Sequence, residues 1–504
     1  AVIDLTTGYT YDGKPVAPSF WGNNASWATA GYFARVNYDY DERYLFEANI
    51  RYDGSSRFRA ENRWAWFPSV SAGWNIAREP FWESASRYVN TLKFRMSYGS
   101  LGNQNIGNWY PTYQKMGVYI NNGGWLQDGK ATNTAYSPEL ISSSLTWETI
   151  RSYNLGLDLG AFNNRLTSSF ELYSRYTTNM IGPAQELPSV LGASVPRTNN
   201  TDLRTYGFDF EVQWKDNLDC GLFYGIRFIL SDNQTEILRY PNDSKLLMTN
   251  GIYSYYPGSH VGDFWGLKTL GIAKTDQEMK AHLATIPHGG QSWLGTDWRA
   301  GDIMYADLDG NGVISMESGT LADHGDLIKL GNDQPRFQFG LDLNASWKGF
   351  DMRVFFQGVG KRDFWPGYVA FWASSNQNIW YMLGFEEHLD YFRNTPSGDL
   401  DVNLDSYYPR PLLNAKNQYM QTKYLQDASY IRLKNFTFGY TIPQKYTQRI
   451  KVANLRLFFT GENLWTGTRL SSVFDPEGIN GNDKISGIGY PIMKTWACGL
   501  TITL

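Results

Sequence analysis

The connections between the predicted strands of this chain alternate in length, short and then long. Alternating apolar and polar residues predict about thirteen strands, each long enough to cross a bilayer at a tilt, near 29–40, 43–53, 65–77, 90–100, 149–161, 164–177, 203–215, 219–232, 335–347, 350–360, 429–441, 454–465 and 491–504. Connections after odd-numbered strands are short, as at Asp41-Glu42, Asn163-Asn164, Asp216-Asn217 and Lys348-Gly349, with two longer ones at 78–89 and 442–453. Connections after even-numbered strands are longer, up to 233–334. A soluble sandwich has no physical reason to sort its loops in this way, whereas a membrane barrel places short turns at one rim and long loops at the other. The alternation therefore predicts an all-β fold, an antiparallel transmembrane β-barrel.

The composition is compatible with a barrel and disfavours a helical membrane protein and a nucleic-acid-binding protein. The 504 residues have a formal net charge of −4, and the mean hydropathy is −0.43. A run of about eighteen apolar residues, which a membrane-spanning helix needs, does not occur in the sequence. The slight acidity disfavours a nucleic-acid partner, which would require a basic patch. Cys220 and Cys498 lie on separate predicted strands and are predicted to be unpaired.

The alternation within each strand predicts which side chains meet lipid. In strand 335–347, Leu341 and Leu343 occupy one face and Asp342 occupies the other. A basic side chain at the bilayer midplane costs roughly 2–4 kcal/mol and an acidic one somewhat less, so the charged face must line a wet interior. The pattern predicts Phe228, Leu341, Leu343 and Leu500 toward lipid, and Glu211, Arg227 and Asp342 toward the lumen.

Several stretches, in order along nearly the whole chain, resemble the SusC/RagA family of TonB-dependent outer-membrane transporters. They are 33–40 (FARVNYDY), 44–58 (YLFEANIRYDGSSRF), 66–74 (WFPSVSAGW), 92–104 (LKFRMSYGSLGNQ), 301–312 (GDIMYADLDGNG), 331–337 (GNDQPRF), 430–440 (YIRLKNFTFGY) and 461–465 (GENLW). The resemblance implies a 22-stranded barrel with a plug in its lumen. It also implies import through the bacterial outer membrane, energised by TonB, beneath a SusD-like surface lipoprotein, and it allows a dimer of such pairs.

The resemblance covers the C-terminal portion of that barrel, residues 1–504, and the family's plug, TonB-contacting segment and first strands precede the matched region. About thirteen strands is an odd number, whereas single-chain bacterial barrels have an even number. The alternation of short and long connections also places residues 1–28 on the outer side, where a barrel cannot begin, because its first strand must pair with its last. We therefore expect an N-terminal plug and barrel portion to complete it, as a separate chain or as the same polypeptide nicked in the loop that contains residues 1–28. Connections 233–334 and 361–428 are predicted to be long extracellular loops. The final Leu504 departs from the aromatic residue with which such barrels commonly end.

Residues 307–315 match the first nine positions of an EF-hand-type loop. The predicted oxygen ligands are Asp307, Asp309, Asn311, the carbonyl of Val313, and Ser315. The twelfth position is Ser318 instead of a bidentate acid, and Glu317, Asp323 or Asp326 could replace it on a different loop path. The sequence therefore predicts a structural calcium site, and the alternative is a cluster of Asx turns in a surface loop.

Large aromatic residues in the predicted loops are candidates for contact with a substrate. They are Trp109, Tyr110, Trp265, Trp293, Trp365, Trp372 and Trp380. Rings stack on sugar faces or hold peptide side chains, but they also fill the cores of ordered loops or form an interfacial girdle. The five histidines fall in predicted loops without metal-ligand spacing or a catalytic arrangement, so they are predicted to be exposed and enzyme activity has no support.

Two functions of different classes remain open from the sequence. The first is import of a bulky polar nutrient, an oligosaccharide or an oligopeptide. The alternative is an outer-membrane receptor or adhesin that binds proteins through its long loops. Uptake that stops when the proton-motive force is collapsed would separate the two.

Overall fold

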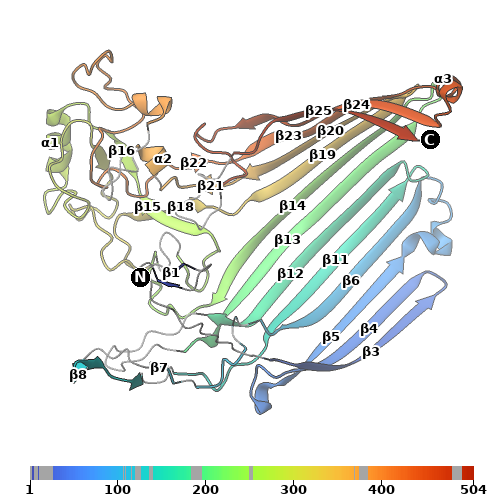
Figure 1. The fold of residues 1–504 in the computed structure, drawn as a ribbon, viewed down its shortest axis with the longest axis horizontal. Helices are drawn as coiled ribbons and strands as arrows, with labels where there is room; N and C mark the ends of the chain where they lie inside the picture. Colours follow the sequence, from blue (N-terminus) through green and yellow to red (C-terminus); the bar gives the residue numbers. More distant parts are fainter. Residues whose placement is uncertain are drawn as a thin grey trace.

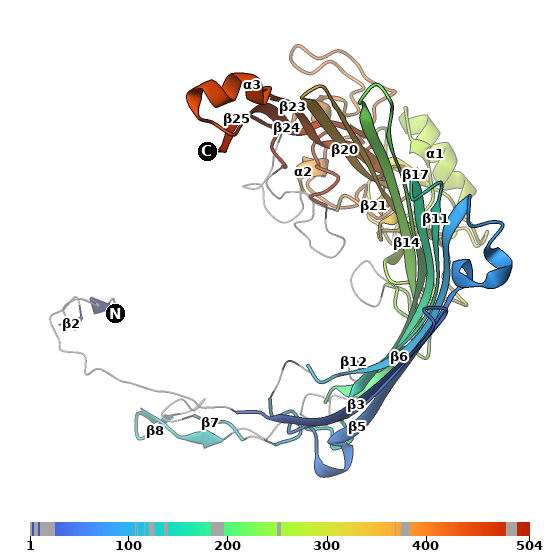
Figure 2. The same ribbon diagram turned by 90° about the vertical axis from the view of Figure 1, so that its right-hand side faces the viewer.

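A computed structural model describes residues 3–4, 9–10, 26–105, 107, 109–114, 116–119, 126–135, 140–182, 196–248, 254–367, 369–373, 384–479 and 491–503. Thirteen antiparallel strands form one sheet, and each strand pairs with its neighbours in chain order. They are β3 (Thr29–Tyr40), β4 (Tyr44–Ser55), β5 (Trp64–Asn75), β6 (Val89–Asn103), β11 (Glu148–Ala161), β12 (Leu166–Gly182), β13 (Thr198–Asn217), β14 (Phe223–Arg239), β19 (Arg336–Trp347), β20 (Phe350–Lys361), β23 (Tyr430–Thr441), β24 (Asn454–Thr468) and β25 (Thr495–Thr503). The predicted all-β fold and its strands are confirmed. Figure 2 shows the sheet as a curved wall, concave on one side.

Short and long connections lie at opposite ends of the sheet, as Figure 1 shows with α3 at one end and α1 at the other. Lys348 and Gly349 join β19 to β20 with φ of 47° and 88°, the left-handed pair that a two-residue type I′ turn requires. The predicted turn at Asp216-Asn217 is wrong, because β13 continues through both residues. The chain turns instead at 218–222, where the Gly221 N–H donates to the Leu218 carbonyl at 2.8 Å. Cys220 therefore lies in a turn and not on a strand.

The remaining elements lie in the connections. The small strands are β1 (Ile3–Asp4), β2 (Tyr9–Thr10), β7 (Val118–Tyr119), β8 (Leu126–Gln127), β9 (Lys130–Ala131), β10 (Thr134–Ala135), β15 (Asp263–Leu267), β16 (Thr269–Ile272), β17 (Ile303–Tyr305), β18 (Leu327–Asn332), β21 (Asp363–Phe364) and β22 (Gln426–Asp427). The helices are α1 (Asp276–Thr285), α2 (Val369–Trp372) and α3 (Gln444–Thr447), with 3₁₀ turns at Ala60–Asn62, Ile76–Arg78, Pro80–Trp82, Glu386–Leu389 and Gln448–Ile450. Among the described residues, no helix is long and apolar enough to span a bilayer.

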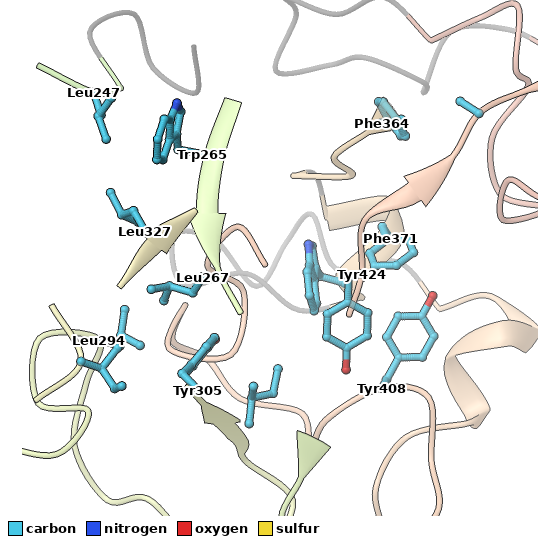
Figure 3. Close-up of a cluster of buried hydrophobic side chains, with 14 of the residues drawn as sticks. Leu247, Trp265, Leu267, Leu294, Tyr305, Leu327, Phe364, Phe371, Tyr408 and Tyr424 are labelled. Carbon is cyan, nitrogen blue, oxygen red and sulfur yellow. The ribbon is translucent and has the colours of Figure 1, made fainter. Parts of the chain in front are cut away.

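The long connections after β14, β20 and β24 pack together into one unit, which we call the cap: the described residues of 240–335, 362–429 and 469–479. Its core contains buried side chains from all three segments, among them Leu267, Tyr424 and Phe474. Figure 3 shows rings and aliphatic side chains from β15, β17 and the second segment facing one another. The connection between β6 and β11 contributes to a separate small cluster, in which Leu145 and Trp147 pack on Phe58 and Phe67. Many apolar residues of the long connections are thus buried in these two clusters at the end of the wall.

Candidate functional site

One face of the wall carries a band of ion pairs between neighbouring strands. Arg227 donates to both carboxylate oxygens of Glu211 at 2.7 and 2.8 Å, and Arg353 donates to Asp342 at 2.5 Å. Equivalent pairs across the wall are Arg35–Glu47, Arg95–Asp158 and Arg456–Asp351. Charged groups cannot face hydrocarbon without a large penalty, so we assign this polar face to the lumen.

The strand register confirms the predicted alternation of faces. Arg227 is the register partner of Asp342, and Phe228 is the partner of Leu341 on the opposite face. At the far side of the sheet Leu500 pairs with Leu457. The polar face contains a hollow of about 550 Å³ whose polar lining includes Asn37, Glu47, Lys93, Arg95, Asn154 and Glu171. Mixed charges and amides at this spacing can exchange hydrogen bonds with a hydrated, polar solute.

The other face is apolar and is bordered by two rows of aromatic side chains. On four strands the two rings are eight residues apart: Tyr32 and Tyr40, Tyr44 and Tyr52, Trp66 and Trp74, and Tyr206 and Trp214. Register pairs such as Tyr32–Tyr52 and Tyr44–Trp74 align the rings into rows. Eight residues of a strand tilted by about 40° span about 20 Å along the membrane normal, close to the ~25 Å apolar band of outer-membrane barrels. The wall therefore has the dimensions of a bilayer-spanning surface.

The structure separates the aromatic candidates into exposed and buried groups. Trp109 is 43% exposed and Trp293 is 37% exposed. Trp293 packs against Tyr419 with ring centroids 5.6 Å apart. The Tyr110 hydroxyl donates to the carbonyl of Ser26 at 2.9 Å. These side chains remain predicted substrate contacts.

Three other candidates belong to the cap interior. Trp265 and Trp372 are buried, at 8% and 7% exposure. Trp365 is partly buried and lies 5.9 Å from Trp372 between ring centroids. Packing of the cap accounts for the positions of all three, and Trp380 lies outside the described residues.

The predicted EF-hand-type loop brings carboxylates together in the cap. The Asp307 carboxylate accepts the N–H groups of Gly310 and Gly312 at 2.7 and 2.9 Å. One carboxylate oxygen each of Asp307, Asp309 and Asp326 lie within 4.8 Å of one another. Of the three suggested replacement acids, Asp326 is therefore the one whose carboxylate converges with those of Asp307 and Asp309.

The remaining predicted ligands bond to their neighbours. The Asn311 side-chain amide donates to Asp309 at 3.0 Å and to Glu317 at 2.7 Å. The Ser315 hydroxyl also donates to Glu317 at 2.7 Å, and the Val313 N–H donates to Asn311 at 2.9 Å. These contacts include the Asx turns that the sequence offered as the alternative.

The electrostatics of Asp326 fit a site that could hold a cation. Asp326 is fully buried, and its carboxylate accepts the N–H groups of Leu308 at 2.6 Å and Ser315 at 2.9 Å. Burial raises the pKa of Asp326, and the nearby charges of Asp309 and Asp307 raise it further. A divalent cation would relieve this repulsion.

A second buried ionic group links distant parts of the cap. Asp302 is fully buried and accepts from Arg410 at 2.7 and 2.8 Å and from Asn417 at 2.9 Å. Lys416 lies 2.9 Å from the same carboxylate. Burial alone would raise the pKa of Asp302, but the hydrogen bonds from Arg410, Asn417 and Lys416 outweigh it and lower that pKa.

Within the described residues, no histidine belongs to a group of side chains that could hold a metal ion. The prediction that all five are exposed holds for His288; His260, His282 and His324 are partly buried, and His388 is buried. Its Nδ1 accepts the Phe385 N–H at 3.0 Å, and its Nε2 lies 3.1 Å from the Phe371 carbonyl. His388 is thus part of the cap core.

Comparison with known proteins identifies the family. Residues 3–464 match the family described as "TonB dependent receptor-like, beta-barrel". The chain is 28% identical over 502 residues to TonB-dependent receptor P3 of Formosa agariphila, covering 93% of this chain and 45% of that protein. It is 26% identical over 476 residues to TonB-dependent receptor SusC of Bacteroides thetaiotaomicron, covering 94% and 43%. The chain thus spans about half the length of the curated relatives it matches.

A solved structure of the RagAB peptide transporter has the same fold, with a TM-score of 0.72 and 22% identity over 99% of this chain and 50% of that one. This similarity confirms the barrel-wall architecture. The sheet, the lipid-facing apolar band and the family match agree, and the chain belongs to the TonB-dependent receptor-like β-barrel family of the bacterial outer membrane.

Proposed function

We propose that this chain forms the wall and outer loops of a TonB-energised importer for a bulky polar nutrient, an oligosaccharide or an oligopeptide. The observation that carries the proposal is the polar wall, on which paired charges such as Arg227–Glu211 alternate with apolar side chains that face lipid. A wall of satisfied charges solvates a polar solute without binding it too tightly for release. The names of the relatives, SusC and the RagAB peptide transporter, support a transport role.

Uptake of a labelled substrate by intact cells tests this function. Mixed oligopeptides and oligosaccharides would be offered to cells with and without a protonophore, which collapses the proton-motive force. Uptake of one class that stops with the protonophore is the expected result. Surface binding without uptake would refute import and favour the alternative, a receptor or adhesin.

We further propose that a SusD-like lipoprotein rests on the cap, which lies outside the cell. Exposed apolar side chains on the cap support a docking surface, among them Leu270 at 59%, Leu389 at 50% and Leu413 at 64% exposure. Replacing all three with serine should reduce co-purification of the lipoprotein while the barrel stays folded. Unchanged co-purification would place the lipoprotein elsewhere.

Coupling to TonB is assigned to the N-terminal plug portion that precedes the matched region in the family.

Trp109 and Trp293 are the best-exposed candidates for substrate contact. Alanine at either position should raise the substrate concentration for half-maximal uptake without changing the amount of protein in the membrane. An unchanged concentration dependence for both variants would remove them from the binding surface.

We also propose that calcium binds Asp307, Asp309, Asn311, Val313 and Ser315, with Asp326 supplying the buried acid. The convergence of Asp307, Asp309 and Asp326 within 4.8 Å supports this site. Its role is structural, since it would fix the loop that joins β17 to β18 in the cap. The loss of a bidentate acid at Ser318 predicts affinity at the weak end of the EF-hand range.

A further inference from the structure

The apolar face of the wall has a hollow of about 800 Å³ that the transport function does not use. Its floor includes Met96, Leu155 and Leu172, which are 46–49% exposed. The lining extends from Phe46 on β4 to Arg336 on β19, eight strands that span about 34 Å at ~4.8 Å per strand. The volume is typical of a ligand site, and the width suits several parallel hydrocarbon chains.

Three register rows show how the chemistry changes along this hollow toward the cap end. Leu155, Leu172 and Phe208 form an apolar row, and Tyr153, Ser174 and Tyr206 form the next row. The third row is Arg151, Tyr176 and Arg204, of which Arg204 lines the hollow and the other two lie just beyond its lining. It lies four residues, or about 13 Å along the strands, beyond the apolar row. An amphiphile with chains on the first row would therefore bring its headgroup to the third.

The two arginines of the third row have no carboxylate partner among the described residues. Arg204 lies over the rings of Tyr176 and Tyr206, at 5.5 and 5.0 Å to the ring centroids, and donates to the Ser174 hydroxyl at 3.3 Å. Arg151 is exposed on the neighbouring strand. In the part of the chain that the structure describes, neither guanidinium forms an ion pair.

The surrounding acids do not neutralise them. Arg336, at the edge of the hollow, is bound by Asp232 through two hydrogen bonds of 2.5 Å. Glu236 is the register partner of Arg204 on β14, but the two side chains form no ion pair among the described residues. The two arginines start from strands two spacings apart, about 10 Å between their backbone positions, and their guanidinium groups remain available for anionic groups.

We propose that this hollow binds a phosphorylated, multiply acylated glycolipid of the outer leaflet, with phosphate on Arg151 and Arg204 and acyl chains on the apolar row. Arginine suits phosphate because its planar group donates two parallel hydrogen bonds. The width of the hollow favours a lipid with more than two chains. The assignment to the outer leaflet rests on the proposed outward position of the cap.

Lipid binding to the intact protein, purified from outer membranes in mild detergent, tests the proposal. The delipidated protein would be titrated with bisphosphorylated lipid A and, separately, with phosphatidylglycerol, and bound lipid would be counted by native mass spectrometry. Lipid A should bind with a stoichiometry of one. The double variant R151E/R204E should weaken its binding by about tenfold or more, because two charge-assisted contacts become repulsive.

Arg175→Glu is the matched control, since Arg175 precedes Tyr176 on β12 and points to the opposite, polar face. It should bind lipid A like the unmodified protein. Equal binding by the double variant and the control would overturn the proposal. Preferential binding of phosphatidylglycerol would overturn the glycolipid assignment and the outward position of the cap, while uptake of nutrient would remain a separate measurement. Self-association that the double variant abolishes, with no lipid retained, would show that a second copy of the chain covers the hollow.

Discussion

Asp302→Ala should open the cap while leaving the wall intact. The carboxylate holds two cations that are themselves buried, since the Arg410 side chain is 14% exposed and the Lys416 side chain 3%. Removing one partner of a buried ion pair costs roughly 3–5 kcal/mol, because the remaining charge stays desolvated. Lys416 keeps hydrogen bonds to the carbonyls of Thr296 and Asp297, both at 2.9 Å. We therefore expect the lower end of that range, about 3 kcal/mol.

Such a loss corresponds to roughly a hundredfold larger population of the open cap. Hydrogen exchange measured by mass spectrometry would detect it as faster exchange in 267–306 and 408–424, with unchanged protection in the wall strands. Asp405→Ala is the control, because Asp405 also pairs with a lysine, Lys274, but both side chains are more than half exposed. Such exposed pairs contribute about 0–1 kcal/mol. Exchange in Asp302→Ala equal to that of the control would refute the role of the buried network.

Three further predictions concern the wall, the cation site and pH. Spin labels at positions 341 and 342 should report lipid and water respectively, and labels that report the same environment would contradict the assigned faces. Calcium should protect 307–326 from proteolysis and Asp309→Ala should abolish that protection, so identical digestion with calcium and with chelator would exclude the site. The pKa of Asp302 is lowered in the folded cap, so its contribution to stability is complete above the unfolded pKa of about 3.9 and is lost as the pH falls through the folded pKa. The protection factors of the cap amides, measured against the intrinsic exchange rate at each pH, should therefore fall in acid, and this fall should be smaller in Asp302→Ala.

The strands could be predicted because lipid on one side and water on the other force the two-residue alternation. The predicted strand ends were less accurate where a strand no longer has lipid on one side and water on the other. β13 was expected at 203–215 but begins at Thr198, because its outward face beyond Phe208 carries Tyr206 and Arg204 instead of apolar residues. There the alternation of apolar and polar residues fades although the hydrogen-bonded ladder continues.

The cap could not be predicted from local patterns. Its core joins residues far apart in the chain, as where the Tyr305 hydroxyl donates to the Lys416 carbonyl at 3.2 Å. Composition alone does not reveal that Trp265 and Trp372 point into this core whereas Trp293 stays partly exposed. The cation site was predictable in part, since Asp307 and Asp309 belong to a local motif. Asp326 joins them only because β17 and β18 fold back on the rest of the cap.

The two longest connections leave and re-enter the wall at adjacent strands. β14 is hydrogen-bonded to β19, and β20 to β23, so each insertion starts and ends about one strand spacing, ~4.8 Å, apart. An insertion with neighbouring ends can be lengthened, shortened or replaced without changing strand register. Because the insertions share one core, however, replacement of one alone would expose apolar side chains of the other. The whole cap is therefore the unit that can be exchanged with its core intact, and chimaeras that transplant 240–335 together with 362–429 and 469–479 should fold where single-loop grafts fail.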